Sequence, residues 1–193
     1  MVILHQLLVF HLRTAGKISL EVRTQVSGMF NIYNILAAAS IGYLFNIDPE
    51  DMRKSIDSFS GMPMRLEIND MDGMKIISDV YNANPASMRC ALQELARIKR
   101  GRTIAVLGDM LELGNYEEEE HRQLGRLLND LSVDIFIAVG ASMVYAAQEF
   151  RGRVYDVKSA DAAGRLLREI HKKGDAVLIK GSRGMNMERV LGG

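Results

Sequence analysis

A group of hydrogen-bonding side chains follows the apolar residues 75–78 and precedes a segment that opens with Pro85. The group consists of Asp79, Tyr81, Asn82 and Asn84. Asn84 before Pro85 is typical of a helix start, because an asparagine oxygen caps free N–H groups and proline has no N–H to satisfy. Helix capping explains Asn84 and Ser87 but leaves three of the polar residues without a structural reason. The turn is therefore predicted to bind a ligand.

Other polar residues follow two further apolar runs, 103–107 and 176–179. Asp109 comes after the first run, and the second is followed by Lys180, Ser182 and Arg183. Because ligands of open α/β sheets bind beyond the carboxyl ends of the strands, these side chains are expected to converge on one crevice. A cationic side chain there would bind a carboxylate or phosphate, and Asp109 would bind an ammonium group.

The elements that must position these residues alternate between strand and helix from about residue 64 to the end. Strands are predicted at 75–78, 103–107, 134–139, 154–157 and 176–179. Several are nearly continuous apolar runs, as expected for strands covered on both faces. Helices are predicted from Pro85 to about Gly101, from about Glu117, at 142–150 and at 160–172. This order predicts a doubly wound, Rossmann-like α/β fold with a mostly parallel sheet.

The first part of the chain has a different pattern. Apolar and polar residues alternate on both sides of Ala15-Gly16, which predicts a β-hairpin. Helices are expected at 32–45 and from Asp48-Pro49 to about Phe59. Residues 60–63 resemble a linker, so the chain is divided into residues 1–61 and residues 62–193.

Composition excludes several classes of protein. The chain is 48% hydrophobic and 25% charged, and its 24 basic residues balance 24 acidic ones, which argues against nucleic acid or membrane as the main partner. The single cysteine, Cys90, excludes an internal disulfide and fits a cytoplasmic location. No phosphate loop of the form G-x-x-x-x-G-K-[ST] is present, and the four histidines have no metal-ligand spacing, so no metal site is expected.

Four stretches resemble motifs of the Mur ligase family, in the family's order. They are residues 28–38, 79–88, 106–114 and 180–188. The sequences of the second and third motifs resemble those of the family members that add D-alanyl-D-alanine to UDP-N-acetylmuramoyl-tripeptide in peptidoglycan synthesis. The resemblance implies an ATP-dependent amide ligase, in which an acyl phosphate forms and is attacked by the dipeptide amine. It also implies that residues 1–61 end the central ATP-binding domain and that the rest is the C-terminal domain.

The resemblance assigns roles to individual residues. It implies that Asn31 and Asn34 read the adenine, that Arg65 reaches the ATP phosphates as a catalytic residue, and that Asp79 contacts the ribose. Chemistry and position within the same scheme make candidates for the dipeptide of Asn82, Asn84, Ser87, Asp109, Lys180, Ser182 and Arg183. Lys180 is also a candidate catalytic residue.

The family carries its phosphate loop, its Mg²⁺ ligands and its UDP-binding domain upstream of the residues present here. ATP and Mg²⁺ are therefore expected as cofactors of a full-length enzyme that includes N-terminal and central domains, whereas this chain alone is expected not to ligate. Two alternatives stay open: a stand-alone module that binds a peptide or nucleotide without catalysis, and a Mur ligase that adds another amino acid.

Overall fold

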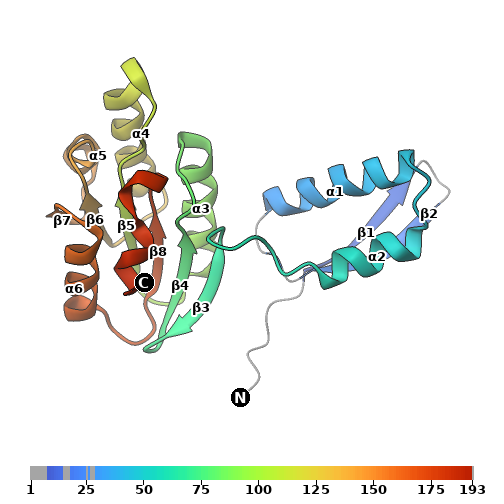
Figure 1. The fold of residues 1–193 in the computed structure, drawn as a ribbon. Coiled ribbons are helices and arrows are strands. Elements are labelled where there is room, and N and C mark those ends of the chain that lie inside the picture. Colours follow the sequence, from blue (N-terminus) through green and yellow to red (C-terminus); the bar gives the residue numbers. More distant parts are fainter. Residues whose placement is uncertain (1–7, 15–17, 25, 27–28, 193) are drawn as a thin grey trace. The chain divides into compact units, whose positions relative to one another are not determined.

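The computed structural model describes residues 8–14, 18–24, 26 and 29–192, and these form two compact units, Met1–Met62 and Pro63–Gly193 (Figure 1). The hairpin turn expected at Ala15-Gly16 and the first motif residue, Gly28, lie outside the described residues. None of the helices within those described ranges is long and apolar enough to cross a membrane.

The first unit is a hairpin followed by two helices, as predicted. Its elements are β1 (Leu8–Thr14), β2 (Ile18–Thr24), α1 (Met29–Leu44) and α2 (Pro49–Ser58). The strands are antiparallel, and Phe10 lies opposite Val22. Helix α2 starts where it does because the carboxylate of Asp48 accepts the N–H of Glu50 at 2.9 Å and Pro49 needs no partner for its nitrogen.

The second unit contains a six-stranded sheet with the order β3-β4-β8-β5-β6-β7 (Figure 1). The strands are β3 (Glu67–Met71), β4 (Met74–Asp79), β5 (Thr103–Gly108), β6 (Ile135–Val139), β7 (Arg153–Val157) and β8 (Ala176–Lys180). All neighbours are parallel except β3 and β4. The predicted doubly wound, mostly parallel α/β fold is confirmed.

Strand β3 was not predicted from the sequence. It forms a hairpin with β4 through Asp72 and Gly73, which have φ angles of 52° and 78°. Two successive positive φ angles are typical of a type I′ turn, for which Asp-Gly is a preferred pair. The Asp-Gly pair was therefore the signal in the sequence that indicated this hairpin.

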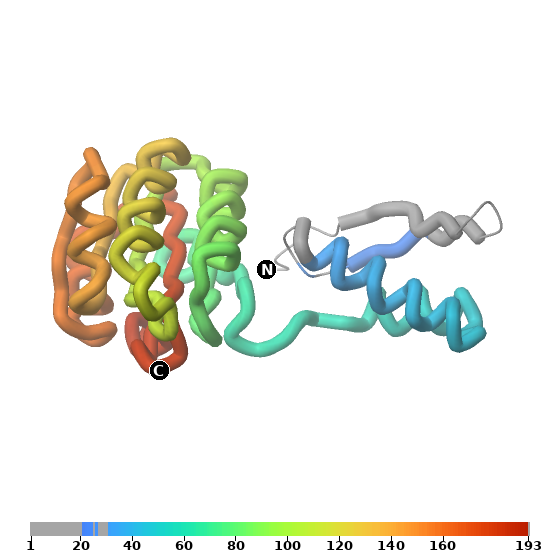
Figure 2. The backbone as a smooth tube through the Cα atoms, turned by 90° about the horizontal axis from the view of Figure 1, so that it is seen from above, coloured from blue at the N-terminus to red at the C-terminus, as the bar shows by residue number. Residues whose placement is uncertain are grey.

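Helices cover both faces of the sheet. They are α3 (Pro85–Ile98), α4 (Glu117–Asp130), α5 (Met143–Glu149) and α6 (Ala160–Ile170), with short 3₁₀ helices η1 (Gly114–Tyr116), η2 (Arg183–Met185) and η3 (Met187–Leu191). Alternate strand residues such as Val106 and Ile179 pack against Ala163, Leu167 and Val190 of α6 and η3. Helices α3, α4 and α5 cover the other face, with α3 and α4 side by side (Figure 2).

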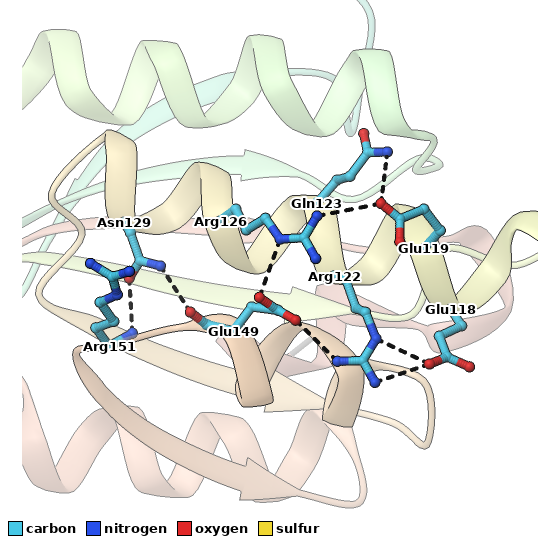
Figure 3. A network of polar contacts seen from close by, with 8 residues as sticks. All are labelled: Glu118, Glu119, Arg122, Gln123, Arg126, Asn129, Glu149 and Arg151. Carbon is cyan, nitrogen blue, oxygen red and sulfur yellow. Dashed lines mark hydrogen bonds and ion pairs between the residues drawn. The ribbon is translucent and has the colours of Figure 1, made fainter.

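A charged network fixes α5 against α4 (Figure 3). Glu149 accepts from Arg126 at 3.2 Å and Arg122 at 3.1 Å, and these hydrogen bonds hold the pKa of Glu149 below its usual value. The helices can approach closely because Gly125 has no side chain: a Cβ there would lie 2.2 Å from the carbonyl oxygen of Ala146. Helix α5 is thereby held with its first turn at the carboxyl end of β6.

Candidate functional site

The loops at the carboxyl ends of β4, β8 and β5 leave the sheet in opposite directions. The chain after β8 enters η2 and η3 on the α6 face, whereas its two neighbours lead into α3 and α4 on the other face. Ligands of open α/β sheets bind where neighbouring strands diverge in this way. The candidate site is therefore the edge formed by residues 80–84, 109–116, 140–142 and 181–188, which we call the carboxyl edge.

Lys180 forms a buried ion pair with Asp79 across this edge. The two residues are register partners in β8 and β4, and Nζ of Lys180 lies 2.5 Å from Oδ2 of Asp79 and 2.8 Å from the carbonyl oxygen of Asn82. The side chain of Lys180 is 2% exposed and that of Asp79 is 14% exposed. Burial lowers the pKa of Lys180 despite the attraction of Asp79. The ammonium group thus ties two loops together and has little surface left for a substrate.

The second oxygen of Asp79 holds the segment that carries Arg65. Oδ1 of Asp79 accepts the backbone N–H of Leu66 at 3.2 Å. Arg65 itself is exposed, and its guanidinium carbon lies 4.2 Å from the centre of the Tyr81 ring. No other described residue forms an ion pair or hydrogen bond with its side chain. Arg65 therefore presents free N–H groups at the carboxyl edge, beside the ion pair.

Two of the predicted dipeptide candidates, Asn84 and Ser87, form the N-terminal cap of α3. Oδ1 of Asn84 accepts the N–H of Ser87 at 2.8 Å, and Oγ of Ser87 accepts the N–H of Asn84 at 3.0 Å, which is a reciprocal capping box. The side chain of Asn82 is exposed, and its Oδ1 accepts the N–H of Ala83 at 2.9 Å. Asn84 and Ser87 thus have a structural role, while the amide nitrogen of the exposed Asn82 has no partner among the described residues.

Ser182 and Asp109 connect four loops. Oγ of Ser182 accepts the N–H of Leu111 at 2.8 Å and donates to the carbonyl of Ala83 at 3.4 Å, and its N–H donates to the carbonyl of Asp109 at 3.1 Å. Oδ1 of Asp109 accepts the N–H groups of Ser142 at 3.1 Å and Met143 at 2.8 Å, where α5 begins. Both side chains are buried. Their contacts make the carboxyl edge one hydrogen-bonded layer.

His121 belongs to the same layer, although no function was predicted for it from the sequence. It is fully buried, its Nε2 accepts the N–H of Met110 at 3.2 Å, and its Nδ1 lies 2.7 Å from the carbonyl oxygen of Glu117. These contacts require a neutral ring with its proton on Nδ1. Glu117 in turn accepts a hydrogen bond from the hydroxyl of Ser142. His121 thus fixes the loop that carries Asp109.

Arg183 and Glu188 lie in η2 and η3, which follow β8. Nη1 of Arg183 donates to Oε1 of Glu188 at 3.2 Å, and the arginine side chain is 54% exposed. The other carboxylate oxygen of Glu188, Oε2, is buried and accepts no hydrogen bond from any described residue. No role was predicted for Glu188 within the motif 180–188, so this buried carboxylate oxygen without a partner in the described part of the chain was missed.

Asn31 and Asn34 belong to the first unit. Both lie in α1, and Nδ2 of Asn34 donates to Oδ1 of Asn31 at 3.5 Å, so the two side chains share a helix face. Because α1 begins at Met29, Asn31 lies inside the helix and is not its N-cap. Their contact with an adenine stays a prediction.

The donors present fit one of the two implied cofactors. The free N–H groups of the Arg65 guanidinium suit the phosphate oxygens of ATP. The described residues contain no group of three or more His, Cys, Asp or Glu side chains that could hold a metal ion.

Comparisons with known proteins agree with this architecture. Residues 64–183 match the family described as "Mur ligase, glutamate ligase domain". The UDP-N-acetylmuramoyl-tripeptide–D-alanyl-D-alanine ligase of Bacillus subtilis (strain 168) is 34% identical over 173 residues, and the match covers 86% of this chain and 38% of that protein. The chain thus spans well under half the length of this curated relative.

Solved structures give the same result. The chain resembles crystal structure I of MurF from Acinetobacter baumannii with a TM-score of 0.85 and 31% identity, covering 96% of this chain and 41% of that one. It resembles MurF ligase from Thermotoga maritima, in complex with ADP, with a TM-score of 0.76 and 26% identity, covering 90% of this chain and 40% of that one.

Proposed function

Since this chain belongs to the Mur ligase family, we propose that it is the C-terminal part of an ATP-dependent ligase that joins D-alanyl-D-alanine to UDP-N-acetylmuramoyl-tripeptide. In this proposal the first unit, up to Met62, ends a central ATP-binding domain, and the second unit is the C-terminal domain. The observation that carries the proposal is the free guanidinium of Arg65, held beside the buried pair Asp79–Lys180 at the carboxyl edge.

The proposed chemistry has two steps. The tripeptide carboxylate would accept the γ-phosphoryl group of ATP with release of ADP, and the amine of the dipeptide would then attack the acyl phosphate through a tetrahedral intermediate that expels inorganic phosphate and loses the amine proton. ATP supplies the phosphoryl group when bound, and Arg65 neutralises charge on its phosphate oxygens with a planar fork of N–H donors. Lys180 acts indirectly, because its ion pair holds Asp79, and Asp79 holds the backbone next to Arg65.

The contacts at the edge suggest how the dipeptide is received. Lys180 and Asp109 are already engaged by protein groups, so we assign them a positioning role. Arg183 is half exposed and its remaining N–H groups are available for the dipeptide carboxylate. Glu188, which pairs with Arg183, is the acidic residue that we propose for the ammonium group. Asn82 supplies a free amide on the adjoining loop, which Ser182 contacts through Ala83.

A ligation assay tests the proposal. The chain would replace the matching segment of the Bacillus subtilis relative, and ADP release would be measured with the tripeptide and D-alanyl-D-alanine. The chimera should release ADP only when both substrates are present. An Arg65→Ala chimera should be slower by about 100-fold, because loss of one preorganised charge-stabilising group costs that much.

The matched control is Arg100→Ala, which removes an exposed arginine that follows α3 and precedes β5, away from the carboxyl edge. This chimera should react at the unmodified rate. Equal rates for the two variants, or no dipeptide-dependent turnover, would refute the proposal. Retained nucleotide or peptide binding without turnover would favour a binding module instead.

A further inference from the structure

The segment that carries Arg65 has an unusual backbone. Met64 and Leu66, on either side of it, have φ angles of 63° and 46°. Non-glycine residues seldom adopt positive φ angles, and such residues persist where the surrounding contacts enforce them. Two strained residues that flank one exposed arginine suggest that the placement of this arginine is enforced.

Three hydrogen bonds enforce this conformation. The N–H of Met64 donates to Oε1 of Glu67 at 2.7 Å, and the carbonyl of Met64 accepts the N–H of Tyr81 at 3.0 Å. The N–H of Leu66 donates to Oδ1 of Asp79 at 3.2 Å, and the side chain of Leu66 is buried. These three hydrogen bonds thus fix the backbone on both sides of Arg65, and the backbone N–H of Tyr81 makes one of them.

The Tyr81 ring then determines where the guanidinium points. The guanidinium carbon of Arg65 lies 4.2 Å from the ring centre, within the range of a cation–π contact. The ring is 46% exposed, and its hydroxyl group makes no hydrogen bond to a described residue. A guanidinium on a ring keeps its N–H groups free at its edge, because the ring occupies only one face of the plane.

The contact between Arg65 and the ring also opposes repulsion by a second cation. Burial lowers the pKa of Lys180, and the positive charge of Arg65 lowers it further. An unrestrained arginine would move its charge away from Lys180 into solvent. The exposed ring opposes that movement, and it does so without a carboxylate that would occupy the N–H groups.

We propose that Tyr81 is a positioning residue whose ring holds the Arg65 guanidinium at the carboxyl edge as a preformed receptor for the phosphate oxygens of a polyphosphate. The inference rests on the proposed function in that Arg65 binds the phosphates of ATP there. It assigns a role to Tyr81 that neither helix capping nor packing supplies. The hydroxyl group takes no part, so phenylalanine should replace tyrosine without loss.

Two measurements on the chain as it stands test this role. The first is the chemical shift of the Arg65 Nε–H proton, which the ring current of Tyr81 should move upfield. The second is the apparent Kd for inorganic tripolyphosphate, obtained by titration of the same resonance and of nearby amides. The variants are Tyr81→Phe, Tyr81→Leu, Arg65→Ala and the double variant Arg65→Ala/Tyr81→Leu. Unchanged amide spectra away from residues 64–66 and 80–84 confirm that each variant is folded.

Tyr81→Phe should keep both the upfield shift and the affinity. Tyr81→Leu should lose the shift and weaken tripolyphosphate binding about threefold to tenfold, the range expected for an exposed or partly desolvated cation–π contact. The double variant should bind no more weakly than Arg65→Ala, because the ring acts through the arginine.

Wild-type affinity in Tyr81→Leu, an unshifted Nε–H proton in the wild-type chain, or tripolyphosphate binding that does not depend on Arg65 would each overturn the inference. The result is separable from the ligase proposal. Tripolyphosphate binding that depends on both residues, together with an Arg65→Ala chimera that ligates normally, would leave the receptor in place and refute the ligase proposal.

Discussion

Lys180→Met is expected to lower the free energy of unfolding of the second unit by about 3–5 kcal/mol, because it leaves the carboxylate of Asp79 buried without its cation. Asp79 is 14% exposed, and the 2.5 Å contact with Lys180 is its only ion pair among the described residues. The measurement is urea unfolding followed by the methyl resonances of Ile137 and Ile179, which lie buried in the sheet.

A second substitution and a control identify the cause. Adding Asp79→Asn to Lys180→Met should recover most of the loss, because the amide is neutral and its oxygen can still accept the N–H of Leu66. Lys99→Met removes the cation of an exposed pair, in which Lys99 is 36% and Asp134 is 42% exposed, and should cost less than about 1 kcal/mol. A small loss in Lys180→Met, or no recovery in the double variant, would contradict the ion-pair account.

The same pair should give a pH signature. Burial lowers the pKa of Lys180 below its ordinary value, so the folded chain releases this proton at a lower pH than the unfolded chain does. Between the two pKa values the unfolded chain binds more protons, and the free energy of unfolding therefore rises with pH. The stability difference between the wild type and Lys180→Met should be constant below this window and widen through it. A difference that narrows would show that the pKa is raised instead.

Asp109→Ala is expected to cost roughly 2–4 kcal/mol in the same assay, because it leaves the N–H groups of Ser142 and Met143 without an acceptor at the start of α5. Asp109→Asn should cost less, since its amide oxygen can still accept. The matched control is Asp156→Ala, which removes an exposed aspartate on β7 that has no partner among the described side chains and should be neutral.

The Asp109 variants also separate two interpretations of this residue. If its carboxylate only positions α5, Asp109→Asn should keep the affinity for D-alanyl-D-alanine in the chimera while its stability falls. Loss of dipeptide affinity with unchanged stability would restore the predicted contact with the ammonium group and contradict the positioning role.

The sequence predicted which residues reach the carboxyl edge, but not which of them are free there. Polar residues that follow apolar strands reach that edge in any parallel sheet, so Asp79, Asp109 and Lys180 could be placed from their positions alone. Their partners depend on the strand order. Strand β8 comes last in the chain yet lies between β4 and β5, and only this insertion puts Lys180 opposite Asp79.

Two features that were not predicted depend on contacts between separate segments of the chain, and a third had a local signal that was not used. The buried His121 joins helix α4 to the loop that carries Met110, and neither segment alone indicates this contact. The free oxygen of Glu188 depends on the conformation of η2 and η3. Strand β3 is different, because the Asp72-Gly73 pair in the sequence indicates its hairpin with β4.

The most direct test of the carboxyl edge as the ligand site is a titration of the ¹⁵N-labelled chain with D-alanyl-D-alanine, read from its backbone and side-chain amide resonances. The account predicts that the largest shifts occur at Asn82, Leu111 and Arg183, on three loops of that edge. Lys99 and Gly101, which lie between α3 and β5, should stay unchanged. Shifts centred on those two residues, or absent from all three loops at saturating dipeptide, would contradict it.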